Sequence, residues 1–260
     1  MDVGRKQSGA AKIMAVLEVL GTADAVLHPH GMTVSEVSRA LGRDKSIVSR
    51  QLKSLLESGL VSRDPAGCFE LSWRLYALAS RAGDQHLAKK AGPVMRKLTD
   101  NVRERTHLTV LSDGEVLTVR SESSRRSIET QGWVGRTIPV GRSSSGMALL
   151  MDHDDDHIVE IAEASDPNGS KRQAAVFLEE IKRSRQRQYS VANRIFDPDI
   201  IGIGTPVRDF SGRIIAALNI SGPAVRIEDH IHLFGSHLVA AAGSLRQPHP
   251  TAVIPVEGGC

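Results

Sequence analysis

Four side chains that can donate hydrogen bonds lie close together on one predicted helix. Ser46, Ser49, Arg50 and Lys53 fall within an arc of roughly 100° when the chain is wound as an α-helix. Their hydroxyl, guanidinium and ammonium groups can bind phosphate oxygens or the base edges of a nucleic acid. An amphipathic helix with an ordinary solvated surface would show the same pattern. The neighbouring elements must therefore decide between the two interpretations.

The preceding segments supply helices against which this face can be held. Residues 10–20 carry an apolar stripe at helical spacing, and Thr33 with Glu36 forms a capping box that starts a second, short helix. Gly42 then provides a tight turn before a third helix over residues 44–58. The apolar positions expected to bury this third helix are Val48, Leu52, Leu55 and Leu56.

Two short strands follow, over residues 60–63 and 68–71, joined by a turn over residues 64–67. This order predicts a winged helix-turn-helix within residues 10–72. Residues 1–82 carry 11 Lys and Arg against 8 Asp and Glu, whereas the remaining chain has 22 of each. The small positive excess favours a polyanionic partner. The residues expected to contact DNA are Thr33, Lys45, Ser46, Ser49, Arg50, Lys53 and Arg63.

A second candidate site begins with a run of serines. Ser143, Ser144, Ser145 and Gly146 immediately precede an apolar turn of helix, so hydroxyls and backbone N–H groups converge at a helix N-terminus. Such an end attracts carboxylates through its dipole and its unpaired donors. The alternative is that these serines only cap the helix.

Composition limits the class of protein. With 260 residues, 40% of them hydrophobic and 24% charged, the chain is long enough for two packed domains and has no run apolar enough to span a membrane. We find no secretory signal in the first residues and expect a cytoplasmic protein. The two cysteines, Cys68 and Cys260, lie far apart and support neither a disulfide framework nor a zinc finger.

Other chemistry is poorly supported by the sequence. His153 and His157 have a spacing that can chelate a metal on a helix, but the acidic residues between them fit the start of a helix better. No nucleophile elbow, phosphate loop, HExxH or dinucleotide fingerprint is present. We therefore expect no catalytic residues, no metal and no cofactor.

Three segments together resemble the IclR family of bacterial regulators. They are MTVSEVSRALGRDKSIVSRQLKSLLESGLVSRDPAGCFELSWRLYALA, GRTIPVGRSSSGMALLM, which looks like the family's Pro-Leu-His...Gly-Lys-Ala segment, and PVRDFSGRIIAALNISGP, which is similar to its closing signature. The resemblance covers nearly the whole chain. It implies an N-terminal winged helix domain, a linker helix, a C-terminal GAF-like domain that binds a small effector, and assembly into dimers or tetramers.

The second half shows the pattern of an α+β domain. Strands are expected over residues 106–111, 116–120, 200–207 and 213–220, with helices over 72–82, 87–102, 171–187 and 228–245, giving an antiparallel sheet flanked by helices. The expected division is a DNA-binding domain over 1–72, a linker helix over 73–86, an effector-binding domain over 87–247 and a disordered tail over 248–260.

The resemblance also places an effector pocket. Ser144 and Ser145 stand where small residues offer backbone N–H groups to a carboxylate, Ser221 keeps a serine of the closing signature, and Asn219 replaces another. An acidic residue and a cysteine that usually complete the pocket for small oxo-acids are replaced by Ala192 and Gly202. Because both replacements remove polar groups and add space, we expect a bulkier, more apolar acid. The expected countercharge is Arg194 or Arg142.

These observations predict a sequence-specific transcriptional regulator controlled by an organic or aromatic acid of a catabolic pathway. A dimer would place two copies of the donor face in successive major grooves of a near-palindromic operator. We expect the protein to repress transcription, with activation of transcription as the alternative. A ligand-sensing protein-interaction module and a hydrolase are more distant alternatives.

Overall fold

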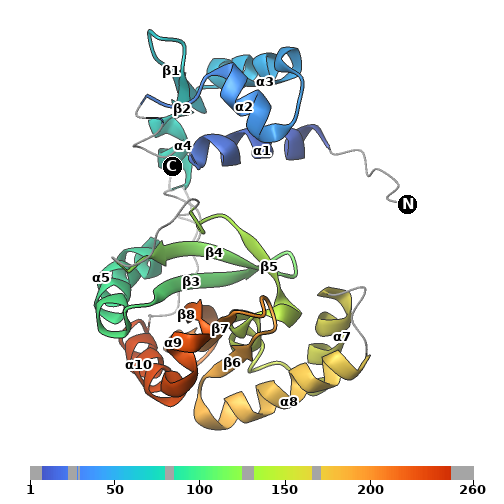
Figure 1. Ribbon diagram of the computed structural model, residues 1–260, viewed down its shortest axis with the longest axis vertical. Coiled ribbons are helices and arrows are strands. Elements are labelled where there is room, and N and C mark those ends of the chain that lie inside the picture. The colour runs from blue at the N-terminus through green and yellow to red at the C-terminus, as the bar shows by residue number, and fades with distance from the viewer. Residues whose placement is uncertain are drawn as a thin grey trace, which may run out of the picture. The chain divides into compact units, whose positions relative to one another are not determined.

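The computed structural model (Figure 1) describes residues 8–22, 28, 30–79, 85–124, 132–165 and 171–246. The chain divides into two compact units, residues 1–85 and 86–260. The expected tail over 248–260 and part of the expected linker helix, residues 80–84, lie outside the described residues. No helix in the described part of the chain is both long and apolar enough to cross a membrane.

The first unit is a winged helix-turn-helix. It contains α1 (Gly9–Gly21), α2 (Val34–Leu41), α3 (Lys45–Glu57), the hairpin of β1 (Val61–Arg63) and β2 (Phe69–Leu71), and α4 (Trp73–Ala79). The capping box at Thr33 starts α2 as predicted, and Gly42 ends it in the left-handed conformation that glycine adopts without strain. The apolar faces of these elements close one core, which includes Val16, Leu20, Val37, Val48, Leu52, Leu55, Val61 and Phe69.

The second unit is built on a six-stranded antiparallel sheet with the order β5-β4-β3-β8-β7-β6. The strands are β3 (Arg105–Ser112), β4 (Glu115–Glu122), β5 (Thr137–Pro139), β6 (Ser190–Asn193), β7 (Ile200–Arg208) and β8 (Ile214–Pro223). The two predicted hairpins, β3–β4 and β7–β8, form as expected and pair with each other through β3 and β8. The two short edge strands β5 and β6 were not predicted.

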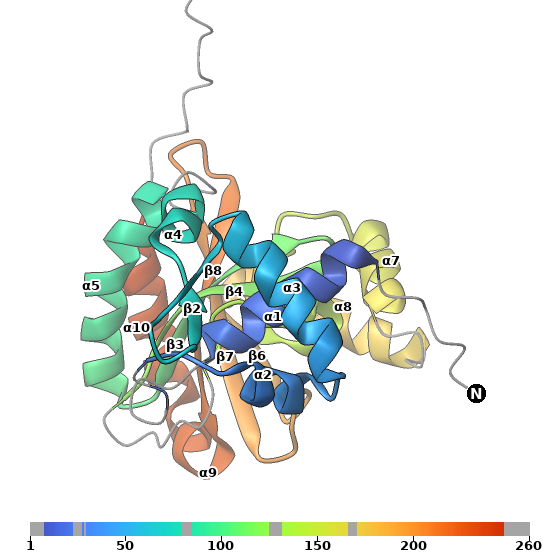
Figure 2. The same cartoon turned by 90° about the horizontal axis from the view of Figure 1, so that it is seen from above.

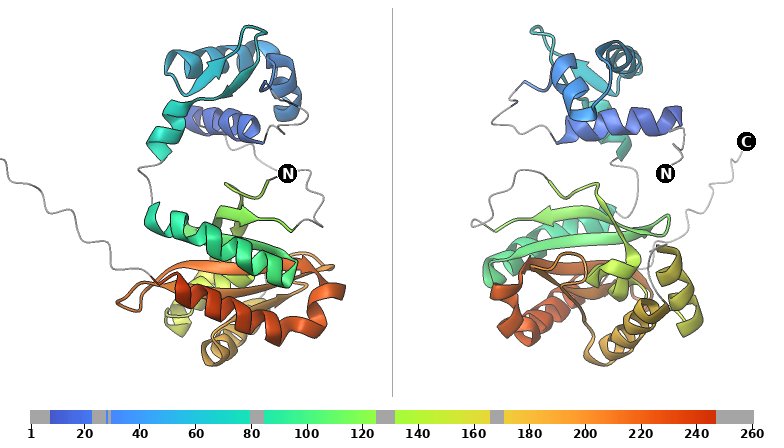
Figure 3. Two further views of the ribbon diagram at one scale, coloured as in Figure 1. Left: turned by 90° about the vertical axis from the view of Figure 1, so that its left-hand side faces the viewer. Right: turned by 45° about the vertical axis from the view of Figure 1, so that its right-hand side comes forward.

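Helices cover both faces of this sheet (Figures 2 and 3). On one face α5 (Gln85–Val102) and α10 (Ile231–Ser244) pack against apolar residues of β3, β7 and β8, with α9 (Ala224–Ile227) and the 3₁₀ turn Glu228–His230 before α10. On the other lie the 3₁₀ turn Val140–Arg142, α6 (Ser144–Leu149), α7 (Asp155–Ser165) and α8 (Lys171–Arg187). The unit is therefore a three-layer α+β domain.

Alternation along the strands separates the two faces. Leu218 and Ile220 of β8 are buried in the core with α5 and α10, so Asn219 and Ser221 between and after them face the side of α6. Leu108 of β3 joins the same core, which places its neighbours His107 and Thr109 on the opposite face. The polar residues of the central strands thus gather on one side of the sheet.

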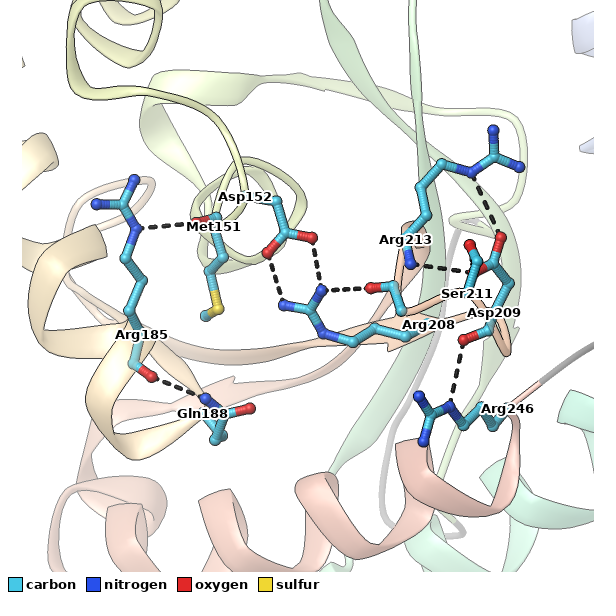
Figure 4. Close-up of polar contacts among 10 residues, drawn as sticks. Met151, Asp152, Arg185, Gln188, Arg208, Asp209, Ser211, Arg213 and Arg246 are labelled. Atoms are coloured by element: carbon cyan, nitrogen blue, oxygen red, sulfur yellow. Dashed lines mark hydrogen bonds and ion pairs between the residues drawn. The ribbon is translucent and has the colours of Figure 1, made fainter. Parts of the chain in front are cut away.

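Ionic contacts attach the α6–α8 layer to the end of β7 (Figure 4). Arg208 donates to both carboxylate oxygens of Asp152, at 2.5 and 2.8 Å, and to the carbonyl of Gly212 at 2.6 Å. In α8, Arg185 donates from Nε to the carbonyl of Met151 at 2.8 Å. The Arg208 contact holds the segment after α6 against the sheet, and the Arg185 contact ties the same segment to α8.

Candidate functional site

Helix α3 presents the predicted donor face to solvent. Asp44 caps the helix by accepting a hydrogen bond from the backbone N–H of Ser46 at 2.7 Å. Val48, Leu52 and Leu55 are buried, whereas Lys45, Ser46, Ser49, Arg50 and Lys53 are exposed. Leu56 was expected in the core but is 37% exposed. It lies a further 100° or so around the helix from Leu55, at the edge of the polar arc.

The two cations of this face are available for binding. Arg50 donates from Nε to the carbonyl of Ser46 at 3.3 Å, one turn earlier on the same helix. Lys53 lies 3.9 Å from Glu57, and both side chains are more than half exposed, so water screens this contact and a phosphate can replace it. The helix therefore offers hydroxyl, guanidinium and ammonium donors on one open surface.

Thr33 and Arg63 are held by contacts of their own. The Thr33 backbone N–H and hydroxyl donate to the Glu36 carboxylate at 2.7 and 2.8 Å and lower its pKa, and the same hydroxyl accepts from the Glu36 backbone N–H at 3.3 Å. Its hydroxyl is thus used in capping α2. Arg63 is exposed on β1, with its guanidinium 5.2 Å from the Phe69 ring and its Nε donating to the Gly67 carbonyl at 3.3 Å. This places a fixed cation on the wing.

The second unit contains a cavity of about 410 Å³ on the face of the sheet that meets the start of α6. Its walls include Val116, Trp133, Ile138, Phe196 and Ile200, and are more apolar than polar. The cavity brings together most of the residues predicted from the sequence: Arg142, Ser143, Ser144, Ser145, Ala192, Gly202, Asn219 and Ser221.

A hydrogen bond between β8 and the start of α6 holds one residue of the serine run in place. Asn219 of β8 donates from Nδ2 to the hydroxyl of Ser144 at 2.5 Å. A Cβ added at Gly202 would lie 2.8 Å from that same hydroxyl. The expectation that Gly202 adds free space is therefore wrong at its Cβ position, because the Ser144 hydroxyl fills it. Gly202 is the residue that lets Ser144 and Asn219 meet.

Two predicted residues do not line the cavity. Gly146 receives the capping bond of Ser143 at 2.9 Å, and a side chain there would collide with the backbone of Val140, so its role is in packing. Arg194 donates to both carboxylate oxygens of Glu228, at 3.1 and 3.0 Å. This contact lowers the pKa of the Glu228 carboxyl and keeps the arginine occupied outside the cavity lining. Arg142 remains as the predicted countercharge that does line it.

The structure adds charged residues that the sequence did not single out. Glu104 is 5% exposed and accepts from Arg226 at 2.6 and 2.8 Å, and both residues line the cavity. Arg105 and Asp197 line it as well. Arg142 donates to the carbonyl of Phe196 at 3.4 Å and has no ion pair with any described residue. No sequence motif marks these positions, because they meet only through strand pairing and loop closure.

A buried histidine lies beside Ser221. The Nε2 atom of His107 is 3.1 Å from the Ser221 hydroxyl, and its Nδ1 atom is buried without a hydrogen-bond partner among the described residues. Its ring centroid lies 5.5 Å from that of Trp133. Burial, and then the nearby Arg105, lower the pKa of His107 to about 3. The imidazole is therefore neutral near pH 7, and the sequence had given no reason to select it.

The two histidines considered for metal binding lie side by side at the start of α7. His153 and His157 stack with centroids 5.3 Å apart, but no cluster of three or more His, Cys, Asp or Glu side chains suited to a metal occurs in the described residues. Asp155 and Asp156 instead occupy the first turn of α7, where negative charge suits the helix dipole.

Comparison with known proteins agrees with both halves of this arrangement. Residues 9–65 match the IclR helix-turn-helix domain, and residues 79–246 match the bacterial transcriptional regulator IclR C-terminal domain. The chain is 26% identical over 240 residues to the HTH-type transcriptional regulator KdgR of Dickeya chrysanthemi, covering 90% of this chain and 79% of that protein. It is 23% identical to the HTH-type transcriptional repressor AllR of Salmonella typhi, covering 80% and 78%.

A solved structure has the same arrangement of elements. It is an IclR homologue from Microbacterium hydrocarbonoxydans in complex with 4-hydroxybenzoate, with a TM-score of 0.69, 25% identity, and coverage of 92% of this chain and 98% of that one. The two family matches correspond to the two units of the structure. One covers the winged helix with its exposed donor face, and the other covers the C-terminal domain with its cavity. The chain belongs to the IclR family of bacterial DNA-binding transcriptional regulators.

Proposed function

We propose that this regulator represses transcription from a near-palindromic operator and that an aromatic carboxylic acid, bound in the cavity of the second unit, changes its affinity for that operator. The carrying observation is the cavity itself: about 410 Å³ with aromatic and aliphatic walls and a cation, Arg142, free of ion pairs among the described residues. Such a site buries an aromatic ring and offers a charge to its carboxylate.

Size and wall chemistry support this ligand class over two- or three-carbon acids. Ala192 adds to the apolar wall formed by Val116, Trp133, Ile138, Phe196 and Ile200. The 4-hydroxybenzoate bound by the related Microbacterium protein has the same chemistry, a ring with a carboxylate. A small oxo-acid would leave most of the apolar wall uncovered.

Calorimetry of the full chain tests the ligand class. Benzoate and 4-hydroxybenzoate should bind more tightly than glyoxylate or pyruvate, and Arg142→Gln should weaken the aromatic acids at least tenfold. Tight binding of glyoxylate or pyruvate with no binding of the larger acids would refute the proposal.

The DNA-binding half is tested at Arg50. Arg50→Ala should cost about 1–3 kcal/mol of specific operator binding, because it removes a donor able to bind a base edge from the exposed face of α3. Ligand affinity should be unchanged. Arg183→Ala, which removes an equal charge from exposed α8, is the matched control and should leave operator affinity unaltered in a fluorescence-anisotropy titration. Equal operator affinity of Arg50→Ala and wild type would refute the assignment.

We infer that the chain acts in the cytoplasm as a homo-oligomer and as a regulator without catalysis. The contact of Ser221 with His107 has the spacing of a nucleophile and its base, so a hydrolase is the alternative to weigh. Two features argue against it: Nδ1 has no orienting acceptor among the described residues, and a pKa of about 3 makes the imidazole a weak base. Hydrolysis of a phenyl ester that is lost in Ser221→Ala would overturn this inference.

A further inference from the structure

We propose that His107 is a positioning residue that fixes the Ser221 hydroxyl as a hydrogen-bond donor, so that the cavity selects ligands presenting an acceptor oxygen to Ser221. This inference rests on the proposed function, since it takes the cavity to be the effector site. It adds a residue and a rule of selectivity: carboxylate and carbonyl oxygens are accepted at this position, and groups that can only donate are rejected.

The first step concerns which ring nitrogen carries the proton. A neutral imidazole has one N–H donor and one acceptor lone pair. Nε2 has a partner, the Ser221 hydroxyl at 3.1 Å, whereas Nδ1 is buried with none among the described residues. Buried N–H groups without a partner are rarer in folded proteins than incompletely used acceptors. The proton therefore lies on Nε2. Nδ1 is the unprotonated nitrogen, and its lone pair has no hydrogen-bond donor among the described residues.

The second step follows from the direction of that bond. If Nε2–H donates, the Ser221 oxygen is the acceptor, and its own proton is left for another partner. Ser221 is half-buried and lines the cavity. In the β7–β8 register it lies opposite Gly202. The hydroxyl proton can therefore be donated to a bound molecule.

The surroundings keep this arrangement fixed. His107 is 6% exposed and its ring lies against that of Trp133, with centroids 5.5 Å apart and planes at 60°. Arg105 lies two residues earlier on the same face of β3. Its positive charge disfavours protonation of the nearby His107 ring. A neutral, immobile imidazole in a single tautomer is what a directional relay to Ser221 requires.

The tautomer is measured on the ligand-free full chain. Nitrogen-15 NMR of histidine-labelled protein separates the two neutral tautomers by the shifts of their ring nitrogens, and the signals missing from His107→Gln identify His107. We expect a proton on Nε2 at pH 7. A proton on Nδ1, or a protonated ring, would overturn the inference whatever the ligand is.

The selectivity is measured by calorimetry with benzoate as the probe and benzylamine as its donor-only counterpart. His107→Leu removes the donor, and benzoate should bind roughly tenfold more weakly. His107→Gln keeps an N–H group within reach of Ser221 and should stay within about threefold of wild type. Benzylamine should bind poorly to wild type and no worse to His107→Leu. Equal benzoate affinity in His107→Leu and wild type contradicts the proposal.

A double-mutant cycle separates positioning from support of the fold. Ser221→Ala should lose about as much benzoate affinity as His107→Leu, and the double variant should lose no more than either alone, because both act through one hydrogen bond. Additive losses would show that His107 only supports the structure. If wild type binds no aromatic acid, the proposed ligand class fails, while the NMR measurement still decides the role of His107.

Discussion

At the scale of single residues, a hydrogen bond in the cavity wall requires a glycine at position 202. Gly202 leaves room for the Ser144 hydroxyl, which Asn219 holds from the neighbouring strand. The glycine is thus a condition for a polar contact that crosses from α6 to β8. Its replacement should therefore disturb the serine run before it changes the volume of the cavity.

Gly202→Ala should destabilise the chain by about 1–3 kcal/mol, since the new Cβ would lie 2.8 Å from the Ser144 oxygen and force it off Asn219. Urea unfolding followed by circular dichroism measures the loss. Ser144→Ala removes the obstructing atom, so the pair Gly202→Ala with Ser144→Ala should be more stable than the sum of the two single losses predicts. If the two losses of unfolding free energy simply add, the Gly202 Cβ does not collide with the Ser144 hydroxyl.

His107 gives the stability of the chain a pH dependence. Its folded pKa of about 3 lies below the usual 6.5, so as pH falls below 6.5 the unfolded chain binds a proton that the folded chain does not. Stability from this group is complete above pH 6.5 and falls by about 1.4 kcal/mol per pH unit as pH decreases towards 3. His107→Gln should remove that slope. The difference between the two denaturation curves at pH 7, 6 and 5 isolates the group from the other histidines.

At the scale of elements, α2 and α3 start at caps that the sequence already encodes. The reciprocal bonds between Thr33 and Glu36 satisfy the first donors of α2, and Asp44 does the same for α3. Because α2 precedes the turn that sets the angle of α3, a loosened α2 also loosens the support of the donor face.

Thr33→Ala should therefore act through stability. The cap is worth about 1 kcal/mol, which corresponds to roughly fivefold faster amide exchange in α2 when opening is local. Hydrogen-exchange mass spectrometry measures this directly, and Thr33→Ser, which keeps the hydroxyl, is the control. If Thr33→Ala weakened operator binding without changing exchange in α2, Thr33 would have to be assigned a contact with DNA.

The same scale shows what could be predicted from the sequence. Helix α8 was predicted with its observed bounds, and the hairpins to within a few residues, because their periodicity and turns are local signals. Strands β5 and β6, of three and four residues, exist through pairing with β4 and β7, which no local pattern reveals. His107 was missed for the same reason, since Ser221 is 114 residues away and only the β3–β8 pairing joins them.

At the scale of the whole molecule, one helix leads from the boundary of the DNA-binding unit to the cavity. Helix α5 begins at Gln85, where the two units divide, and ends at Val102, two residues before Glu104. Glu104 lines the cavity and is bound to Arg226. A ligand that competes for Arg226 would act on the residue at the end of this helix. Coupling then requires only that the ligand favour one arrangement of that end over another.

Assembly is the remaining requirement, because a near-palindromic operator needs two donor faces. Helix α4 carries Trp73, Tyr76 and Leu78, which are 83%, 66% and 53% exposed, and the two aromatic rings contact edge to face at 5.6 Å. Its start is anchored to the winged helix, since Ser72 donates from its hydroxyl to the Gly59 carbonyl at 2.5 Å. Exposed aromatic residues grouped on an anchored element are typical of a protein interface, and we propose that a second copy of this chain covers them.

Replacing both rings, Trp73→Ser with Tyr76→Ser, should raise the dissociation constant of the dimer at least tenfold, since each buried aromatic side chain contributes about 1 kcal/mol or more. Sedimentation velocity measures that constant. Operator binding should then depend steeply on protein concentration, while benzoate affinity stays unchanged because the cavity lies within one unit. Val176→Ser, at an apolar position of α8 that is 61% exposed, is the control. An unchanged dissociation constant would show that α4 is not the dimer interface and that its aromatic residues bind another partner.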